Sequence, residues 1–356
     1  MLDFFKGFYG VLKGMDYCLR FVFLTGVTNF SKVSIFSDLN QLVDISLDKN
    51  YAGVCGISEK ELTTYFQPEI QALSEELEMT YDETLAKMKK RYDGYRFAKK
   101  GDDMYNPFSV LNVFNSRDFG YYWFQTGTPT ILVKSLRNTN YDVRKLDNEV
   151  TISARSIGDY RADETSLIPL LYQSGYLTIK SYSADLDAYT LGYPNEEVKY
   201  GFLDELIPAY VPKWGIDETF SALTFIKAIR SGDVDAFMKL LKAYYASIPY
   251  DLEDKIDKDE RYYQLVCYLL FKNMGQFVDA EVKSADGRAD VVVKTANAIY
   301  IFEFKMDKNA TAEDALAQID DKGYLIPYTA DDRRLVKIGV ELSVEQRGIT
   351  RWIMSE

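Results

Sequence analysis

The chain contains no histidine among its 356 residues, and this absence excludes several kinds of active site. A Ser-His-Asp or Cys-His arrangement, a histidine-ligated zinc ion and a histidine general base all require an imidazole ring. Catalysis by this chain would therefore have to use carboxylates, lysine, tyrosine or a hard metal ion held by oxygen ligands.

Cysteine and long apolar runs are scarce as well. The three cysteines, Cys18, Cys55 and Cys267, form no CxxC pair, which excludes a disulfide framework and a zinc ribbon and fits a reducing cytosol. No apolar run reaches about 18 residues, so we expect no transmembrane helix. These absences together predict a cytoplasmic protein that does not enter a membrane.

Positive charge is in deficit. The chain has 42 lysine and arginine residues against 54 aspartate and glutamate residues, a net charge of −12. This balance argues against broad nonspecific adhesion to nucleic acid and against binding to anionic membranes. The remaining composition, 47% hydrophobic and 27% charged, is typical of a globular protein, and the length suggests two or three domains.

The first part of the chain predicts helices around one strand. Residues 1–20 carry apolar residues at helical spacing, and the apolar run Phe21–Thr25 is typical of a strand buried on both faces. The segment Ser58–Glu61 is a capping box that opens a helix, residues 69–92 have a helical pattern, and Asn106-Pro107 opens another helix.

Residues 140–235 change character and predict a small mixed domain. Its predicted strands are 175–179 and 188–191, and its predicted helices are 203–213 and 217–231. A further helix follows at 233–246. The charged stretch 247–258, which contains Pro249, is the best candidate boundary before the last domain.

The last segment has a distinct order of predicted elements. A helix is followed by three strands, a second helix and a final strand. Their ranges are 260–273, 277–283, 289–294, 298–305, 312–321 and 335–342. This α-β-β-β-α-β order is the main clue to the fold.

One strand of this segment carries a charged pair. Because residues alternate between faces along a strand, Glu303 and Lys305 share one face while Phe302 and Phe304 point to the other. Asp290 opens the strand that is expected to pair with this one, which places two carboxylates together; they repel each other unless a cation lies between them. A Mg²⁺ ion there would bridge to a phosphate, and Lys305 could orient or deprotonate a water molecule.

The alternative interpretation of Glu303 and Lys305 is an ordinary solvated strand face. A Glu-x-Lys pair on a strand is common and usually has no chemical role. The strand is otherwise very apolar, however, so a charged pair on it is costly unless it is paired or used.

The order of these residues resembles the PD-(D/E)XK nuclease-superfamily domain at the C-terminus of a bacterial family of AAA-ATPase-like proteins. The matching stretches are Glu260, Glu281, Gly287-Arg288-x-Asp290, Glu303-Phe304-Lys305, Ala315-x-x-Gln318-Ile319 and Lys322-x-Tyr324. The resemblance implies that Asp290 and Glu303 bind Mg²⁺ or Mn²⁺, that Lys305 is catalytic and that Gln318 supports the site. It also implies that Glu260, on a helix, adds a carboxylate to the metal site, with Glu281 as a substitute. Contacts to substrate are implied for Arg288, Lys322 and Tyr324.

The N-terminal part resembles the same family. The matching stretches are Phe23-Leu-Thr-Gly-Val-Thr-Asn-Phe-Ser31, Leu39-Asn40, Tyr92-Asp-Gly-Tyr95, Tyr105-Asn-Pro-Phe-Ser109, Tyr122-Trp123 with Thr126-Gly127, and Gly192-Tyr-Pro-Asn195. The resemblance implies an α/β chain in three parts. These are a partial P-loop-type AAA-like domain at 1–138, a small α+β linking domain at 139–250, and a restriction-endonuclease-like αβββαβ domain at 251–356.

The sequence departs from this family because it has no GxxxxGK[ST] loop and no apolar strand ending in paired acids ahead of Phe21. Without the amides of such a loop ATP has no anchor, so we expect no tight ATP binding. The resemblance places the missing loop upstream of residue 1, with a truncated edge that would favour a homo-oligomer or a partner chain. Thr25, Thr28 and Asn29 are either remnants of a nucleotide-sensing strand end or a plain polar exit turn.

Three interpretations of function follow. The first is a Mg²⁺-dependent nuclease-like phosphodiesterase that acts on DNA or RNA. The second is a non-catalytic interaction scaffold, and the third is a fragment of an ATPase whose missing half acts in trans. Residues 251–356 contain 15 lysine and arginine residues against 21 aspartate and glutamate residues, a net charge of −6, which weakens the first interpretation because phosphate binding depends on cations.

Overall fold

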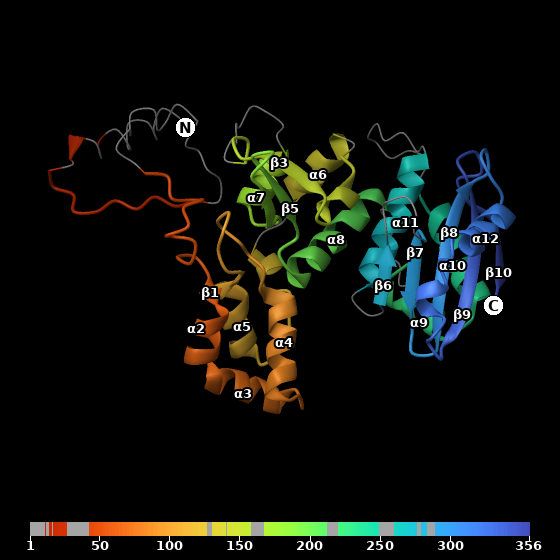
Figure 1. Ribbon diagram of the computed structural model, residues 1–356, viewed down its shortest axis with the longest axis horizontal. Helices are drawn as coiled ribbons and strands as arrows, with labels where there is room; N and C mark the ends of the chain where they lie inside the picture. The colour runs from red at the N-terminus through yellow and green to blue at the C-terminus, as the bar shows by residue number, and fades with distance from the viewer. Residues whose placement is uncertain are drawn as a thin grey trace. The chain divides into compact units, whose positions relative to one another are not determined.

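The computed structural model describes residues 11, 14–15, 17–26, 43–126, 130–139, 141–157, 167–211, 220–248, 260–275, 279–282 and 289–356. Figure 1 shows these residues as a coloured ribbon. Contacts group the chain into two compact units. The first comprises 1–135 with 145–202, and the second comprises 136–144 with 203–356.

The first unit begins with helices that start at the residues that the sequence predicts. Helix α2 (Glu59–Tyr65) opens at the Ser58 capping box, and α5 (Pro107–Ser116) opens at Asn106, whose side chain accepts from two backbone N–H groups. The predicted helical stretch 69–92 is two helices, because Glu78 adopts a left-handed φ of 52° and Thr80 starts a new capping box. These are α3 (Gln67–Glu76) and α4 (Tyr81–Tyr92).

The core of these helices is buried and mostly aliphatic, with two tyrosine rings. It consists of Leu62, Ile70, Leu73, Met88, Tyr92, Tyr105, Val110 and Val113. A two-stranded ladder of β1 (Ile57–Ser58) and β2 (Met104–Tyr105) closes one end of it.

A three-stranded antiparallel sheet completes the first unit. Its order is β3-β5-β4, where β3 (Val150–Ser153) is a strand that the sequence analysis omits. The other two strands, β4 (Thr178–Ser183) and β5 (Ala188–Gly192), lie close to their predicted positions. Helix α7 (Leu167–Gln173) lies between β3 and β4 in the chain, and α8 (Glu196–Tyr210) follows β5 and begins earlier than the predicted 203. The connecting elements are η1 (Trp123–Thr126), α6 (Thr130–Asn138) and η2 (Val143–Leu146).

The second unit is built on a five-stranded mixed sheet of order β10-β9-β8-β7-β6. The pair β8–β9 is parallel and the other pairs are antiparallel. The strands are β6 (Asp279–Val282), β7 (Val291–Lys294), β8 (Ala298–Met306), β9 (Arg334–Ser343) and β10 (Gly348–Ser355). The helices are α9 (Ala222–Arg230), α10 (Val234–Ala246), α11 (Glu260–Met274), α12 (Ala312–Asp321) and the short η3 (Ile326–Tyr328). The predicted α-β-β-β-α-β order is confirmed, and β10 is an additional strand that the sequence analysis did not anticipate.

Strand β8 is the centre of this sheet, and its two faces pack against different helices. Phe302 and Phe304 contact the ring of Phe271 on α11, with Phe302 also in contact with Phe237 on α10. On the opposite face, the buried cluster that includes Ile301 packs against α12. The alternation that the sequence predicts for β8 is therefore present.

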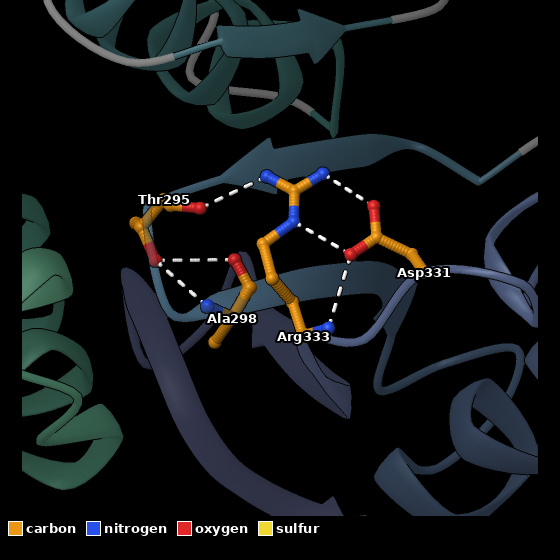
Figure 2. A network of polar contacts seen from close by, with 4 residues as sticks. All are labelled: Thr295, Ala298, Asp331 and Arg333. Carbon is orange, nitrogen blue, oxygen red and sulfur yellow. Dashed lines mark hydrogen bonds and ion pairs between the residues drawn. The ribbon is translucent and has the colours of Figure 1, made fainter.

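A polar network fixes the start of β8 and β9, as Figure 2 shows. Arg333 donates two hydrogen bonds to the carboxylate of Asp331, at 2.8 and 2.6 Å, and a third to the backbone oxygen of Thr295, at 2.9 Å. The Thr295 hydroxyl donates to the Ala298 carbonyl and accepts from the Ala298 N–H. The network joins the β7–β8 turn to the first residues of β9 and so sets the register of the parallel pair.

One expectation differs from the structure. The predicted strand Phe21–Thr25 is wrong: these residues form no strand, and Phe21 and Phe23 are 79% and 51% exposed. A strand needs a neighbour for its backbone groups, and nothing in the described parts of the chain pairs with this run. Most of the predicted 1–20 helix, together with Thr28 and Asn29, lies outside the described residues.

Helices α9 and α10 fall into the same compact unit as the C-terminal sheet. The ring of Phe237 on α10 lies against β8, and Trp352 of β10 donates to Asp235. The division into three domains is a prediction that this grouping does not test. The boundaries at 138/139 and 250/251 remain predictions. Among the described helices, none combines the length and apolar character needed to cross a membrane.

Candidate metal and catalytic site

The C-terminal half of β8 holds the charged pair found in the sequence. Glu303 is buried, with 2% of its surface exposed, and Lys305 is half-buried. The Nζ of Lys305 donates to Glu303 Oε1 at 3.2 Å, so both side chains lie on the face that α12 covers. The apolar strand therefore carries its charges as a paired, largely covered group.

Asp290 lies beside this pair. Val291 of β7 is opposite Phe302 of β8, and continuing this antiparallel register by one residue places Asp290 opposite Glu303, on the same face. Asp290 Oδ2 accepts from the Phe304 backbone N–H at 2.9 Å. The carboxylate of Asp290 thus accepts from an N–H group that a carbonyl of the neighbouring strand would otherwise bond. This hydrogen bond fixes Asp290 just before the first residue of β7.

Gln318 reaches the site from α12. Its Oε1 accepts from Lys305 Nζ at 2.6 Å, and its Nε2 donates to Glu303 Oε1 and, at 3.2 Å, to the hydroxyl of Tyr324. Helix α12 begins at a capping box formed by Thr311 and Asp314. The amide of Gln318 therefore bridges the two charged side chains and holds the lysine away from solvent.

A glycine lets α12 approach this closely. Gly339 is the parallel partner of Glu303 on β9, and a Cβ added there would lie 2.3 Å from the backbone oxygen of Ala312 and 2.9 Å from the nitrogen of Leu316. No side chain fits in that gap. The sequence analysis did not single out Gly339, although an isolated glycine in an apolar strand is a signal of close backbone approach.

Burial and repulsion control the charges of the two carboxyl groups. Burial raises the pKa of Asp290, with partial offset from the Phe304 N–H and from Lys305. Burial also raises the pKa of Glu303, and the nearby charge of Asp290 raises it further, while Lys305 lowers it. The two groups therefore lose their protons less readily than free carboxyl groups do, and a bound cation would favour that loss.

The residues fit a divalent metal ion in one specific respect. Glu303 Oε2 is buried and makes no hydrogen bond within the described part of the chain, so one carboxylate oxygen is left for a ligand. Asp290 supplies a second carboxylate, and oxygen atoms are the ligands that Mg²⁺ and Mn²⁺ prefer. No cluster of three candidate metal ligands occurs among the described residues.

The remaining predicted site residues are placed as follows. Glu260 is the first residue of α11, and Glu281 lies on β6, but both side chains fall outside the described residues, as does all of Arg288. Lys322 is exposed at the C-cap of α12. Tyr324 is buried, and its hydroxyl accepts from Gln318. The substrate contacts predicted for Arg288, Lys322 and Tyr324 remain predictions.

The site lies on the central strand of the sheet. Strand β8 has two neighbours on each side, so Glu303 and Lys305 lie on that central strand. The added strand β10 and the pairing of β6 with β7 give this central position.

A mixed sheet with an aspartate ahead of one strand, a Glu-x-Lys pair on the next and a glutamine from the following helix is the arrangement that the comparisons can be set beside. Residues 258–352 match the family model "PD-(D/E)XK nuclease superfamily", and residues 1–36 match the family model "Predicted AAA-ATPase". The C-terminal part of the chain is therefore similar to nuclease-superfamily domains, and its first 36 residues are similar to predicted AAA-ATPases.

A curated relative extends this similarity along the chain. It is the "Uncharacterized protein in vnfD 5'region" of Azotobacter chroococcum mcd 1, which is 34% identical over 362 residues. The match covers 99% of this chain and 66% of the relative, so the chain spans slightly less than two thirds of the relative's length. No solved structure matches the chain significantly.

Proposed function

We propose that the second unit is a Mg²⁺-dependent or Mn²⁺-dependent nuclease-like phosphodiesterase that acts on nucleic acid. The observation that supports this most strongly is the buried Glu303 Oε2, which lacks a hydrogen bond in the described part of the chain while Asp290 lies opposite. The match of residues 258–352 to a nuclease superfamily, whose members generally use divalent metal ions, supports the same chemistry.

Each side chain has a distinct task in this proposal. Asp290 and Glu303 would hold the metal ion, and Glu260 on α11 would add a further carboxylate. A bound divalent ion would polarise the phosphate and favour ionisation of a water molecule. As an ammonium group, Lys305 orients the attacking water and stabilises the negative charge that develops on the phosphate; as a neutral amine, it would instead take the proton of the water.

Gln318 and Tyr324 position these groups. The Gln318 amide restricts Lys305 and Glu303 to one geometry, and the Tyr324 hydroxyl in turn fixes that amide. The substrate itself is anionic, so positive side chains near the site must offset the acidic balance of residues 251–356. Lys322, exposed at the end of the same helix as Gln318, and Arg288 are the residues that we assign to this task.

The proposal is tested by cleavage assays with the full chain. Supercoiled plasmid, single-stranded DNA and RNA are incubated with Mg²⁺ or Mn²⁺, and nicking is measured for the unmodified protein, Asp290→Asn and Lys305→Met. We expect metal-dependent cleavage that each substitution lowers by about 100-fold or more, because a metal ligand or a water-positioning group is lost. Asp332→Asn, at an exposed aspartate of the same unit, is the matched control and should retain full activity.

The scaffold interpretation is the second candidate, and the net charge of −6 for residues 251–356 favours it. It predicts that the folded protein binds Mn²⁺ weakly or not at all and cleaves none of the three substrates. The absence of tight ATP binding, and an oligomer or partner chain at the N-terminal edge, remain predictions as well.

A further inference from the structure

The first unit contains a second polar site, far in sequence from the nuclease-like residues. A pocket of about 450 Å³ lies at the N-terminus of α8. It is lined by Lys90, Asp147, Asn148, Lys180, Tyr193, Asn195, Glu196 and Lys199. Its volume lies within the range of small-molecule sites, which is about 300–1,000 Å³.

Asn195 is the N-cap of α8 and a buried part of the pocket wall. Its backbone oxygen accepts from the Lys199 N–H, and its side-chain Oδ1 accepts from the Val198 N–H at 3.1 Å. The side chain is 8% exposed, and its amide nitrogen Nδ2 makes no hydrogen bond within the described residues. A buried amide N–H without an acceptor costs free energy, so a ligand that supplies an acceptor for Nδ2 would be favoured.

The wall of the pocket contains one more lysine than carboxylates, three against two. Lys90 pairs with Glu196 at 2.9 Å, and Lys199 pairs with Asp147 at 3.3 Å. Lys180 makes its hydrogen bond to a neutral acceptor, the Pro194 carbonyl, at 3.2 Å, so it is the lysine of the wall that has no direct ion pair. The carboxylates of Asp103, Asp147 and Asp93 act on it from a greater distance. Burial lowers the pKa of Lys180, which a nearby anion would reverse.

At two places around the pocket, a glycine lets another part of the chain approach its backbone closely. Gly94 has a φ of 103°, and a Cβ there would lie 2.2 Å from the Pro194 oxygen that Lys180 also contacts. A Cβ on Gly192 would lie 1.9 Å from Asn148 Oδ1. Two motifs that the sequence analysis noted, Tyr92-Asp-Gly-Tyr95 and Gly192-Tyr-Pro-Asn195, therefore pack directly against each other to shape one wall, and the nuclease-like site uses neither.

We propose that this pocket binds the phosphate group of a small phosphorylated molecule. The Asn195 amide, the Lys180 ammonium group and the positive end of the α8 dipole are three features that favour an oxyanion. The space beyond a single phosphate accommodates the rest of a small ester. The proposal is independent of the nuclease-like function, since every lining residue belongs to the first unit.

The test is a titration of the full chain, in EDTA, with inorganic phosphate and with a phosphomonoester, ribose 5-phosphate. Binding is followed by calorimetry and by the shift in melting temperature. We expect both probes to bind and to stabilise the protein; tighter binding of the ester identifies an ester site, and equal affinities identify a site for the phosphate group alone. Sulfate is included as a competitor of similar shape.

Two variants decide whether the pocket is responsible. Asn195→Asp keeps the acceptor that caps α8 but replaces the amide donor with a negative charge, and Lys180→Met removes the ammonium group that has no direct ion pair. Each should weaken phosphate binding about tenfold or more, while Lys60→Gln, at an exposed lysine of the same unit, should leave it unchanged. If Asn195→Asp lowers the melting temperature of the free protein, Asn195→Ser replaces it. The proposal is overturned if neither probe binds at millimolar concentration, or if these variants bind as tightly as the unmodified chain.

Discussion

Asp290→Asn should make the metal-free protein more stable at neutral pH, although it should abolish cleavage. Asp290 and Glu303 lie opposite each other on neighbouring strands, and burial raises the pKa of both groups. Replacing one carboxylate by a neutral amide of the same shape removes their repulsion. The new side-chain carbonyl can still accept from the Phe304 N–H.

The size of this effect follows from the charges. Two unit charges about 6 Å apart at an effective dielectric constant of about 20 repel each other by about 3 kcal/mol. Lys305, which bonds to Glu303, offsets part of this repulsion, so we expect a net gain of about 1–2 kcal/mol. For a unit of this size that gain raises the melting temperature by about 2–8 °C.

The pH dependence gives the sign of the effect. A carboxyl group whose folded pKa is raised binds its proton more tightly in the folded state than in the unfolded state. The loss of folding stability caused by the two carboxyl groups is therefore absent below their ordinary unfolded pKa, near pH 4. It grows as the pH rises from there and is complete above their raised folded pKa values. The difference in stability between Asp290→Asn and the unmodified chain should be small near pH 4.5 and largest near pH 8.

The assay is thermal unfolding in EDTA across this pH range, with Asp332→Asn as the control for removing one exposed negative charge. Adding Mn²⁺ should stabilise the unmodified protein more than Asp290→Asn. A substitution that destabilises the chain at pH 8, or a gain that is constant from pH 4.5 to 8, would refute the reasoning about the paired carboxylates.

Two further substitutions probe the packing that supports each unit. Gly339→Ala should destabilise the second unit by about 1–3 kcal/mol in a urea titration, because its Cβ would press on the start of α12. It should also lower cleavage, since α12 carries Gln318. Gly101→Ala is the control and should be near neutral in the same titration, because no atom lies closer than 3.7 Å to the added Cβ. Glu197→Ala should lower the free energy of unfolding by about 2–4 kcal/mol, because the fully buried carboxylate accepts from the Ser109 hydroxyl and the Trp123 N–H. Glu197→Gln retains an acceptor and should recover most of that loss. Equal losses for both variants would contradict this account.

The parts of the structure that the sequence predicts best are those set by local patterns. The shared face of Glu303 and Lys305 follows from strand alternation, and the start of α12 follows from the capping residues around Thr311. Gln318 meets the pair because α12 must bury Ile319 against the sheet, which turns the preceding residue toward β8. The chemical roles of these residues are not fixed by this geometry and remain proposals.

The features that the sequence does not predict depend on distant partners. The run Phe21–Thr25 has the composition of a buried strand, but composition does not supply the neighbouring strand that such a run requires. The closeness of Gly339 to α12 depends on how a helix crosses a sheet, and no local signal specifies the distance. The same is true of the Asp290 bond to the Phe304 N–H, which arises because β7 begins at Val291, one residue after Asp290.

The free-energy cost of burying the site's carboxylates favours a metal-dependent enzyme over a non-catalytic interaction scaffold. Glu303 is 2% exposed and keeps one carboxylate oxygen without a hydrogen bond in the described part of the chain, while a second, half-buried carboxylate lies opposite. A binding scaffold gains nothing from this arrangement, because an apolar pair at the same positions would pack without repulsion or desolvation. A metal ion would remove both penalties at once by neutralising the charge and coordinating the free oxygen. The metal dependence of stability, measured with and without Asp290, therefore separates the two interpretations even before a substrate is known.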